Sequence, residues 1–206
     1  MTENTVAIAS FATRLRLIGV LTIVLVSMAN AKCGEIANPL PLHNGTNVVN
    51  LDGAGLTATV VIARRDNFNA HSFEVTTFFA SLKTEDEGEK ELKIIPIELT
   101  REKEVLHLIT GGGADCVLQD FRVIPQPAER TAILITGERE FGRHFADSQH
   151  VTFRYYRLTR NTEGAVGRPA LYFDFEKKAV SQKKYCDVNE AFEAELHLPA
   201  NGRGSE

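Results

Sequence analysis

The chain has 206 residues, and its 23 Lys and Arg against 27 Asp and Glu give a formal net charge of −4. Hydrophobic residues make up 43% and charged residues 24%, a balance that is typical of globular proteins and argues against a disordered tail, a collagen-like repeat or many membrane spans. The slight acidity also argues against nucleic acid as the main partner, because binding to phosphates needs a basic surface.

The first predicted element is a signal peptide over residues 1–31. Two arginines precede an almost purely apolar run, Leu17–Val26, and Ala29-Asn30-Ala31 has the small-x-small pattern that a signal peptidase cleaves. The apolar run has about half of the roughly twenty residues that a membrane-spanning helix needs, and an uncleaved N-terminal anchor is the alternative. We expect cleavage after Ala31, which leaves a single domain over residues 32–206, periplasmic or secreted and without a membrane span.

Export decides how the three cysteines are interpreted. Cys33, Cys116 and Cys186 are odd in number and too widely spaced for a compact metal motif. In an oxidising compartment, one disulfide and one remaining thiol is the simplest arrangement, and three pairings are open. Because Cys33 lies just after the cleavage site, we predict a Cys116–Cys186 bridge.

The rest of the chain is predicted to consist mainly of short strands. Runs rich in β-branched and aromatic residues, several with alternating polarity, are separated by turn residues such as Asn44-Gly45. Pro96 falls inside one run and predicts an edge strand or a bulge there. Strands in this spacing, without helices between them, indicate an antiparallel sandwich or barrel. The predicted strands are Thr46–Leu51, Leu56–Ala63, Ser72–Leu82, Leu92–Leu99, Val105–Ile109, Cys116–Ile124, Thr131–Thr136, Val151–Thr159 and Ala170–Glu176.

One helix is predicted after the last strand. Asp187 can cap its N-terminus, and Glu190, three residues later, completes the spacing of a capping box. Val188, Phe192 and their neighbours form an apolar face with helical periodicity, and Pro199 ends the helix. The fold class is therefore predicted to be all-β with a short terminal α-helix.

The turn Asn50–Gly55 is a candidate cation site. An acid followed by a sharp glycine turn is typical of loops that present oxygen ligands, but calcium loops need several such oxygens, and Ala54 stands where a second acid would be. A plain hairpin turn is the alternative. Asp52 is the candidate ligand of a structural cation, and no other cofactor is assigned.

A polar corner between two strong strands is the candidate ligand-binding surface. Two arginines, an acid, two asparagines and a histidine cluster there, close to two phenylalanines. Asn and Asp in turns usually bond their own backbone, so a purely structural corner is the alternative. The candidate residues are Arg64, Arg65, Asp66, Asn67, Asn69 and His71.

No catalytic residues are assigned, and we predict that the protein is not an enzyme. Ser181-Gln182-Lys183-Lys184 matches the Ser-x-x-Lys motif of β-lactamases, but the companion Ser-Asp-Asn and Lys-Thr-Gly elements are absent. Gly-x-Ser-x-Gly and His-Glu-x-x-His do not occur, and the six histidines lack the spacing of zinc ligands. An enzyme with an unrecognised site is the alternative.

Three segments of the chain resemble the CarG family. The similarity is strongest over residues 46–80, which include the Asp52-Gly53 turn and the polar corner, and it extends more loosely to Cys116–Asp120 and Tyr185–Asn189. That family comprises exported proteins linked to intrinsic carbapenem resistance, and it is related in fold to periplasmic inhibitors of invertebrate-type lysozyme. The resemblance implies a β-sandwich of two antiparallel sheets, a homodimer and a bound cation.

The resemblance also implies a non-enzymatic function, in which the protein protects against a carbapenem by binding or shielding rather than by hydrolysis. Arginine forks suit a carboxylate, and a carbapenem carries one, so Arg64 and Arg65 are the predicted ligand contacts. The alternative is a lysozyme-inhibitor-like module that binds a protein target. The loop Gly137–His150 is the candidate for that role, although it is more charged than a cleft plug needs.

Overall fold

The computed structural model describes residues 38–52, 55–69, 71–83, 90–100, 102–111, 116–126 and 131–200. The predicted signal peptide and Cys33 lie outside these residues. Within the described ranges, we find no helix with the length and apolar character needed to cross a membrane. In chain order, the elements are β1 (Gly45–Asn50), β2 (Thr57–Arg65), β3 (Phe73–Lys83), β4 (Lys90–Ile94), β5 (Ile97–Thr100), β6 (Lys103–Val105), β7 (Leu108–Gly111), β8 (Gln119–Ile124), β9 (Ile133–Arg139), β10 (Gln149–Arg160), β11 (Leu171–Tyr185) and α1 (Val188–Leu196).

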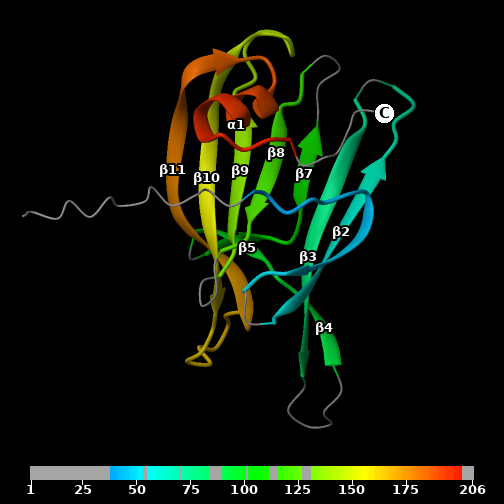
Figure 1. The fold of residues 1–206 in the computed structure, drawn as a ribbon, viewed down its shortest axis with the longest axis vertical. Helices are drawn as coiled ribbons and strands as arrows, with labels where there is room; N and C mark the ends of the chain where they lie inside the picture. Colours follow the sequence, from blue (N-terminus) through cyan, green and yellow to red (C-terminus); the bar gives the residue numbers. More distant parts are fainter. Residues whose placement is uncertain are drawn as a thin grey trace, which may run out of the picture. The chain divides into compact units, whose positions relative to one another are not determined.

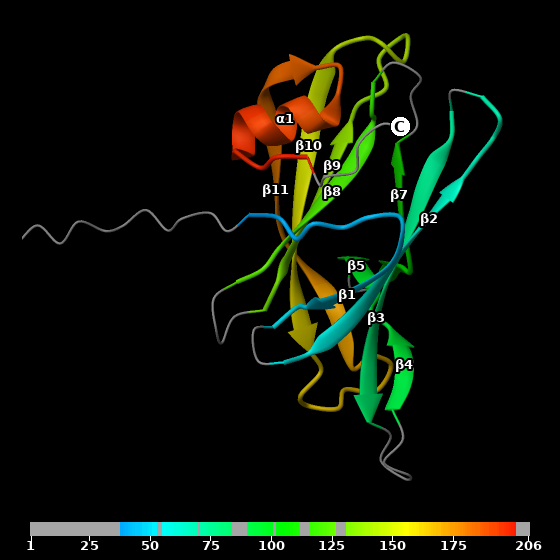
Figure 2. The same cartoon turned by 45° about the vertical axis from the view of Figure 1, so that its right-hand side comes forward.

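These strands form one mixed sheet (Figures 1 and 2). Its order is β1-β2-β3-β7-β8-β9-β10-β11-β5-β6, and β4 pairs with β3 beside this path. Neighbouring strands are antiparallel, except for β11 and β5, which are parallel. β3 is long enough to share one edge between two partners, because its first half pairs with β7 and its second half with β4.

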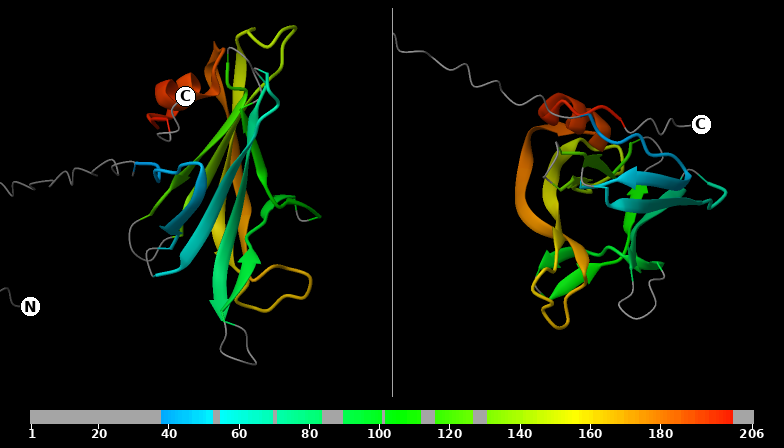
Figure 3. Two further views of the ribbon diagram at one scale, coloured as in Figure 1. Left: turned by 90° about the vertical axis from the view of Figure 1, so that its right-hand side faces the viewer. Right: turned by 60° about the horizontal axis from the view of Figure 1, so that its bottom comes forward.

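The prediction of a mostly β fold with one short helix is confirmed, but the predicted division into two sheets is not. The described strands are hydrogen-bonded into a single sheet, which curls round a common interior (Figure 3). Phe78 on β3 contacts both Phe121 on β8 and Phe173 on β11, with ring centroids 5.9 and 5.2 Å apart. Strands that are distant in the sheet order thus bury their apolar faces against one another, as two stacked sheets would.

Two hydrophobic clusters stabilise the molecule, one on each face of the curled sheet. The first fills the interior and contains side chains from β2, β3, β5, β8, β9, β10 and β11. The second lies between α1 and the outer face of β8, β9 and β10, where the rings of Phe153 and Phe192 are 5.2 Å apart. Strand alternation places every second residue of β8, β9 and β10 in each cluster.

Most predicted strands are confirmed to within a few residues. The run Leu92–Leu99 is divided between β4 and β5, because Pro96 has no amide hydrogen for a β-ladder. The run Val105–Ile109 is divided between β6 and β7. β11 continues to Tyr185, well beyond the predicted end at Glu176, because pairing with β10 extends the strand into an exposed, lysine-rich segment.

The predicted helix cap and the predicted disulfide both lie at the start of α1. The Asp187 carboxylate accepts hydrogen bonds from the Asn189 amide at 2.7 Å and from the Val117 amide at 3.1 Å. Cys116 and Cys186 form the bridge, with their Cα atoms 5.6 Å apart. Together these contacts tie the start of α1 to the segment that leads into β8.

Candidate functional site

The polar corner is a loop that largely satisfies its own polar groups. Asp66 accepts hydrogen bonds from the Phe68 amide at 2.7 Å and from the Ser72 hydroxyl at 3.2 Å. The bond from the Phe68 amide is the main cause that lowers the pKa of the Asp66 carboxyl, and the Ser72 bond adds to it. The carboxylate is therefore engaged in holding the loop in shape.

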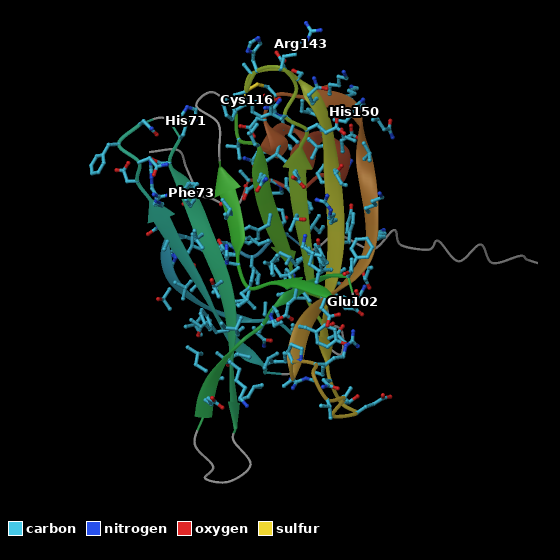
Figure 4. The ribbon with its side chains drawn as sticks, turned by 180° about the vertical axis from the view of Figure 1, so that it is seen from behind. His71, Phe73, Glu102, Cys116, Arg143 and His150 are labelled. Atoms are coloured by element: carbon cyan, nitrogen blue, oxygen red, sulfur yellow. A yellow bond between two sulfur atoms is a disulfide. The ribbon has the colours of Figure 1, made fainter. Side chains whose placement is uncertain are left out.

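The two asparagines of the corner have the same role. Asn67 donates from Nδ2 to the His71 carbonyl at 2.9 Å, and Asn69 accepts from the His71 amide at 2.9 Å. Such bonds are typical of Asx turns, which is the structural interpretation of the corner. The imidazole of His71 contacts Phe145 with ring centroids 5.3 Å apart, so the corner touches the loop between β9 and β10. Figure 4 shows His71 and Arg143, from these two loops, at the same end of the sheet.

The two arginines of the corner are not brought together. Arg64 and Arg65 are exposed consecutive residues at the end of β2, and successive side chains of a strand point to opposite faces of a sheet. The guanidinium of Arg65 lies over the Phe73 ring, 5.4 Å from its centroid. The joint contact of Arg64 and Arg65 with a ligand carboxylate stays a prediction.

Asp52 is held by protein groups within its turn. Its carboxylate accepts a hydrogen bond from the Leu56 amide at 2.8 Å and forms an ion pair with Arg160 at 3.1 Å. In the part of the chain that the structure describes, no group of three His, Cys, Asp or Glu side chains could hold a metal ion. The cation site at Asp52 also stays a prediction.

The serine of the Ser-x-x-Lys match is engaged in backbone contacts. Ser181 is 4% exposed; its hydroxyl accepts from the Val151 amide at 2.9 Å and donates to the Lys183 carbonyl at 2.6 Å. His150 contacts the carbonyl of Ser181 rather than its hydroxyl, at 3.0 Å. This hydroxyl therefore links β10 to β11.

A cavity of about 690 Å³, which we call the concave cavity, opens on the inner face of the curled sheet. It is lined by residues of β5 to β11, which strand alternation turns toward the interior. The lining combines an apolar part with a polar part. The apolar part consists of Ile97, Leu99, Val105, Leu108, Ile109, Phe121 and Phe175, and the polar part includes Thr110, Gln119, Thr136, Glu138, Arg154, Tyr156, Lys103, His107 and Lys178.

Three charged groups of the concave cavity lie where β9, β10 and β11 are side by side. Arg154 on β10 forms an ion pair with Glu138 on β9 at 2.7 Å, and both side chains are partly exposed. Lys178 on β11 is the register partner of Arg154 and lines the same cavity. Two cations and one carboxylate therefore share this part of the wall.

Two hydroxyl groups lie deeper in the cavity. Tyr156 is 1% exposed, and its hydroxyl hydrogen-bonds with Thr136. Burial raises the pKa of Tyr156, against a smaller opposite effect from Arg154, so the phenol keeps its proton at neutral pH. Thr110 is 5% exposed, and in the described part of the chain its hydroxyl has no hydrogen-bond partner.

The loop between β9 and β10, residues 140–148, is pinned from both sides. The buried Arg139 guanidinium donates to the carbonyls of Phe145 and Asp147. The Asp147 carboxylate accepts from the amides of Arg143 at 2.8 Å and His144 at 2.9 Å. This loop presents Phe141, which is 51% exposed, with its ring 4.7 Å from that of Phe145.

Sequence reasoning did not identify the concave cavity. Its signal was the alternation in β10, where Arg154 shares a strand face with Tyr156 and Leu158, both of which are buried. An arginine in line with buried residues indicates a polar group at the border of a core. The strands that complete the site around it could not be inferred from that pattern.

Comparison with known proteins places the chain in a family. The model of a family described as "Carbapenem resistance protein CarG-like" matches residues 42–194. A solved structure, titled "Crystal structure of CarG", is similar with a TM-score of 0.61 and 24% sequence identity, over 79% of this chain and 99% of that one. At this identity the likeness shows the fold alone. A comparison with curated proteins found no match. Because the family model covers well over half of its length, the chain belongs to the CarG-like family of carbapenem resistance proteins.

Proposed function

We propose that this protein is exported and protects cells against a carbapenem without opening the β-lactam ring. Its family membership supports the link to carbapenem resistance. The observation that carries the non-hydrolytic part is the lining of the concave cavity. Among the described residues that form it, none is a serine or a cysteine, and the Thr110 hydroxyl has no base as a partner. Acyl transfer from a β-lactam needs a nucleophile that is activated by an adjacent base.

Two observations support export. The sequence has a predicted signal peptide over residues 1–31, and the Cys116–Cys186 bridge is of a kind that persists in oxidising compartments and is rare in the cytosol. Protein recovered from the periplasm should therefore begin at Lys32, and its intact mass measures this directly. A full-length mass in that fraction would instead indicate an uncleaved anchor.

The protection itself is tested with cells and with purified protein in parallel. Survival under a carbapenem should rise when the gene is expressed, whereas incubation of the drug with purified protein should leave the ring absorbance unchanged. Ring opening by the wild-type protein would show that it is an enzyme, and the non-hydrolytic proposal would be wrong. Equal survival with and without the gene would exclude the proposed protective function.

A protein-binding module is the second candidate, and the pinned loop between β9 and β10 favours it. The contacts of Arg139 and Asp147 fix this loop before any partner arrives, and a rigid loop with an exposed aromatic residue is suited to binding another protein. Inhibition of an invertebrate-type lysozyme by the wild type, lost in Phe141→Ser, would support this function. If the wild type does not inhibit the lysozyme, this second function is excluded.

The homodimer also remains part of the proposal. Light scattering of the purified protein measures its mass in solution. Twice the monomer mass is expected.

A further inference from the structure

We infer that the concave cavity is a binding site for a small amphipathic molecule with one carboxylate, which Arg154 and Lys178 hold at its wall. A carbapenem is a molecule of this class, so the inference rests on the proposed function and gives it a location. The cavity volume of about 690 Å³ lies within the roughly 300–1,000 Å³ that is common for small-molecule sites.

The register of the sheet places the two cations side by side. Arg154 lies opposite Lys178 on β11 and opposite Thr136 on β9, and all three residues line the cavity. Like charges directly opposite each other destabilise a sheet, so this pair is unfavourable without an anion between or beside them. Glu138 supplies one such anion, at 2.7 Å from Arg154.

The remaining charge matches a monoanion. Glu138 offsets one of these two cations, and the carboxylate of Asp120, which also lines the cavity, is paired with Arg122 at 2.8 Å. A single positive charge is left at this wall, and one ligand carboxylate would neutralise it. Lys103 also lines the cavity, but it comes from β6, a strand that pairs with neither β10 nor β11. A carboxylate bound by a guanidinium and an ammonium forms charge-assisted hydrogen bonds, which are stronger than those between neutral groups.

The rest of the cavity suits the uncharged part of such a ligand. Phe121 is fully buried below it, and Phe175, 40% exposed, offers an apolar face beside Tyr156, with ring centroids 5.8 Å apart. The Thr110 hydroxyl is buried, lines the same cavity and has no hydrogen-bond partner among the residues that the structure describes. Buried polar groups normally have a hydrogen-bond partner, so this hydroxyl is available to a polar atom of a ligand.

Calorimetry with an intact carbapenem, and with its neutral carboxylate methyl ester, tests the charge requirement. We expect the acid to bind and the ester to bind about tenfold more weakly or worse, because a charge-assisted contact is lost. An ester that binds as tightly as the acid would overturn the inference.

Lysine variants on β11 test the location. Lys178→Gln should weaken binding of the acid about tenfold. Lys177→Gln removes the same charge from the neighbouring residue, whose ammonium lies over the Tyr155 ring 4.7 Å from its centroid, and should leave binding unchanged. Equal effects of the two variants, or none from either, would exclude this wall as the anion site.

Two further variants separate a loss of binding from a loss of stability. Arg154→Gln combined with Glu138→Gln removes the ion pair without leaving one charge alone, and it should also weaken binding of the acid. Thr110→Val keeps the shape of the side chain, so thermal stability should stay the same or rise while binding weakens. If the Thr110→Val protein binds the acid as tightly as the wild type, the Thr110 hydroxyl is not part of the binding site.

The polar corner is the competing location, and the same measurements separate the two. If Arg64→Ala combined with Arg65→Ala abolishes binding while Lys178→Gln does not, the carboxylate lies at the corner and the inference is wrong. If cells with the Lys178→Gln protein survive a carbapenem as well as those with the wild type, the cavity assignment fails although the protective function stands. If the wild-type protein itself gives no protection, the proposed function is wrong, whatever the location of the binding site.

Discussion

Single side chains anchor the loops and the helix of this protein to its sheet. Arg122 is the clearest case, because its guanidinium is fully buried and yet has several acceptors. It donates to Asp120 at 2.8 Å, to Asn189 of α1 at 2.6 Å and to the Pro199 carbonyl at 2.7 Å. The guanidinium also lies over the Phe192 ring, 4.4 Å from its centroid. One residue of β8 thus holds both the helix and the segment that follows it.

Replacing Arg122 should be strongly destabilising. Arg122→Met leaves the carboxylate of Asp120 and the Pro199 carbonyl without this donor, and breaking a buried ion pair typically costs about 3–5 kcal/mol. Urea unfolding of the wild type and variant measures the difference. Arg157→Met is the control, because its pair with Glu176 is partly exposed and such pairs contribute about 0–1 kcal/mol. Equal losses in the two variants would contradict this assignment.

Asp147 should make the stability of the protein depend on pH. The hydrogen bond from the His144 amide is the main cause that lowers the pKa of its carboxyl, and the bond from the Arg143 amide adds to it. A carboxyl with a lowered pKa stabilises the folded state above its unfolded pKa, about 3.9, and this contribution is lost as the pH falls through the folded value. Asp147→Asn should therefore lower the melting temperature at neutral pH, and its difference from the wild type should shrink below about pH 4. Thermal melts across this range measure it, and a difference that is constant with pH would contradict the role of the charge.

At the scale of elements, α1 packs so closely on β9 that one position of the strand must be glycine. A Cβ atom at Gly137 would lie 2.7 Å from Cε2 of Phe192 and 2.8 Å from Cγ2 of Val188. The helix is short and is held by its apolar face, so its position depends on this contact. The same glycine is the register partner of Phe153, which contacts Phe192 from the next strand.

Gly137→Ala should displace α1. Extra volume in a packed core typically costs about 1–3 kcal/mol, and the free energy of unfolding should fall by that amount. Adding Phe192→Leu to the variant should recover part of the loss, because the shorter side chain removes the nearest atoms. A double variant that is less stable than the sum of the single changes would indicate another cause.

The Cys116–Cys186 bridge connects α1 to the sheet across a sequence separation of 70 residues. Loop-closure entropy gives such a bridge roughly 4 kcal/mol, and removal of a native disulfide typically costs about 2–5 kcal/mol. The double variant Cys116→Ala with Cys186→Ala should lose a comparable part of its unfolding free energy. Non-reducing peptide mapping of the wild type should find this linkage with Cys33 unpaired, and a bridge to Cys33 would contradict it.

At the scale of the whole molecule, the curled sheet is held together by contacts across its interior. Phe78 lies at the centre of these contacts, since its ring touches Phe121 of β8 and also Phe173 of β11, a strand that is remote from β3 in the sheet order. The same curl forms the concave cavity, because it turns the inner faces of β7 to β11 and of β5 and β6 toward a shared space. The stability of the fold and the shape of the cavity thus have one origin.

Phe78→Ala should test this arrangement. Deletion of a buried phenyl ring typically costs about 3–5 kcal/mol, and the loss should appear as a lower midpoint of denaturant unfolding. Phe68→Ala is the matched control, because Phe68 is 97% exposed and surface changes usually stay within about 0.5 kcal/mol. A small effect of Phe78→Ala would mean that the two sides of the sheet do not depend on each other.

The local signals in the sequence predicted the elements because those signals act over a few residues. Alternation along the predicted strand Ser72–Leu82 places Thr76 and Phe78 on the same face, and both are buried in the structure. Asp187 was predicted as the helix cap, and its carboxylate accepts the Asn189 amide. Pro96 was expected to disturb its run, and the chain divides there into β4 and β5. The disulfide followed from export and from the position of Cys33, and it is present.

The pairing of strands was decided by the tertiary structure alone. Alternation tells which residues of a strand share a face, but it does not tell which strand lies beside it, because the ladder hydrogen bonds come from backbone groups that every residue carries. The predicted division into two sheets was not confirmed for this reason: the choice between one curled sheet and two stacked sheets depends on contacts such as β11 with β5. The concave cavity has the same dependence, since Thr110, Glu138, Arg154 and Lys178 come from four strands, β7, β9, β10 and β11, whose order in the sheet does not follow from alternation.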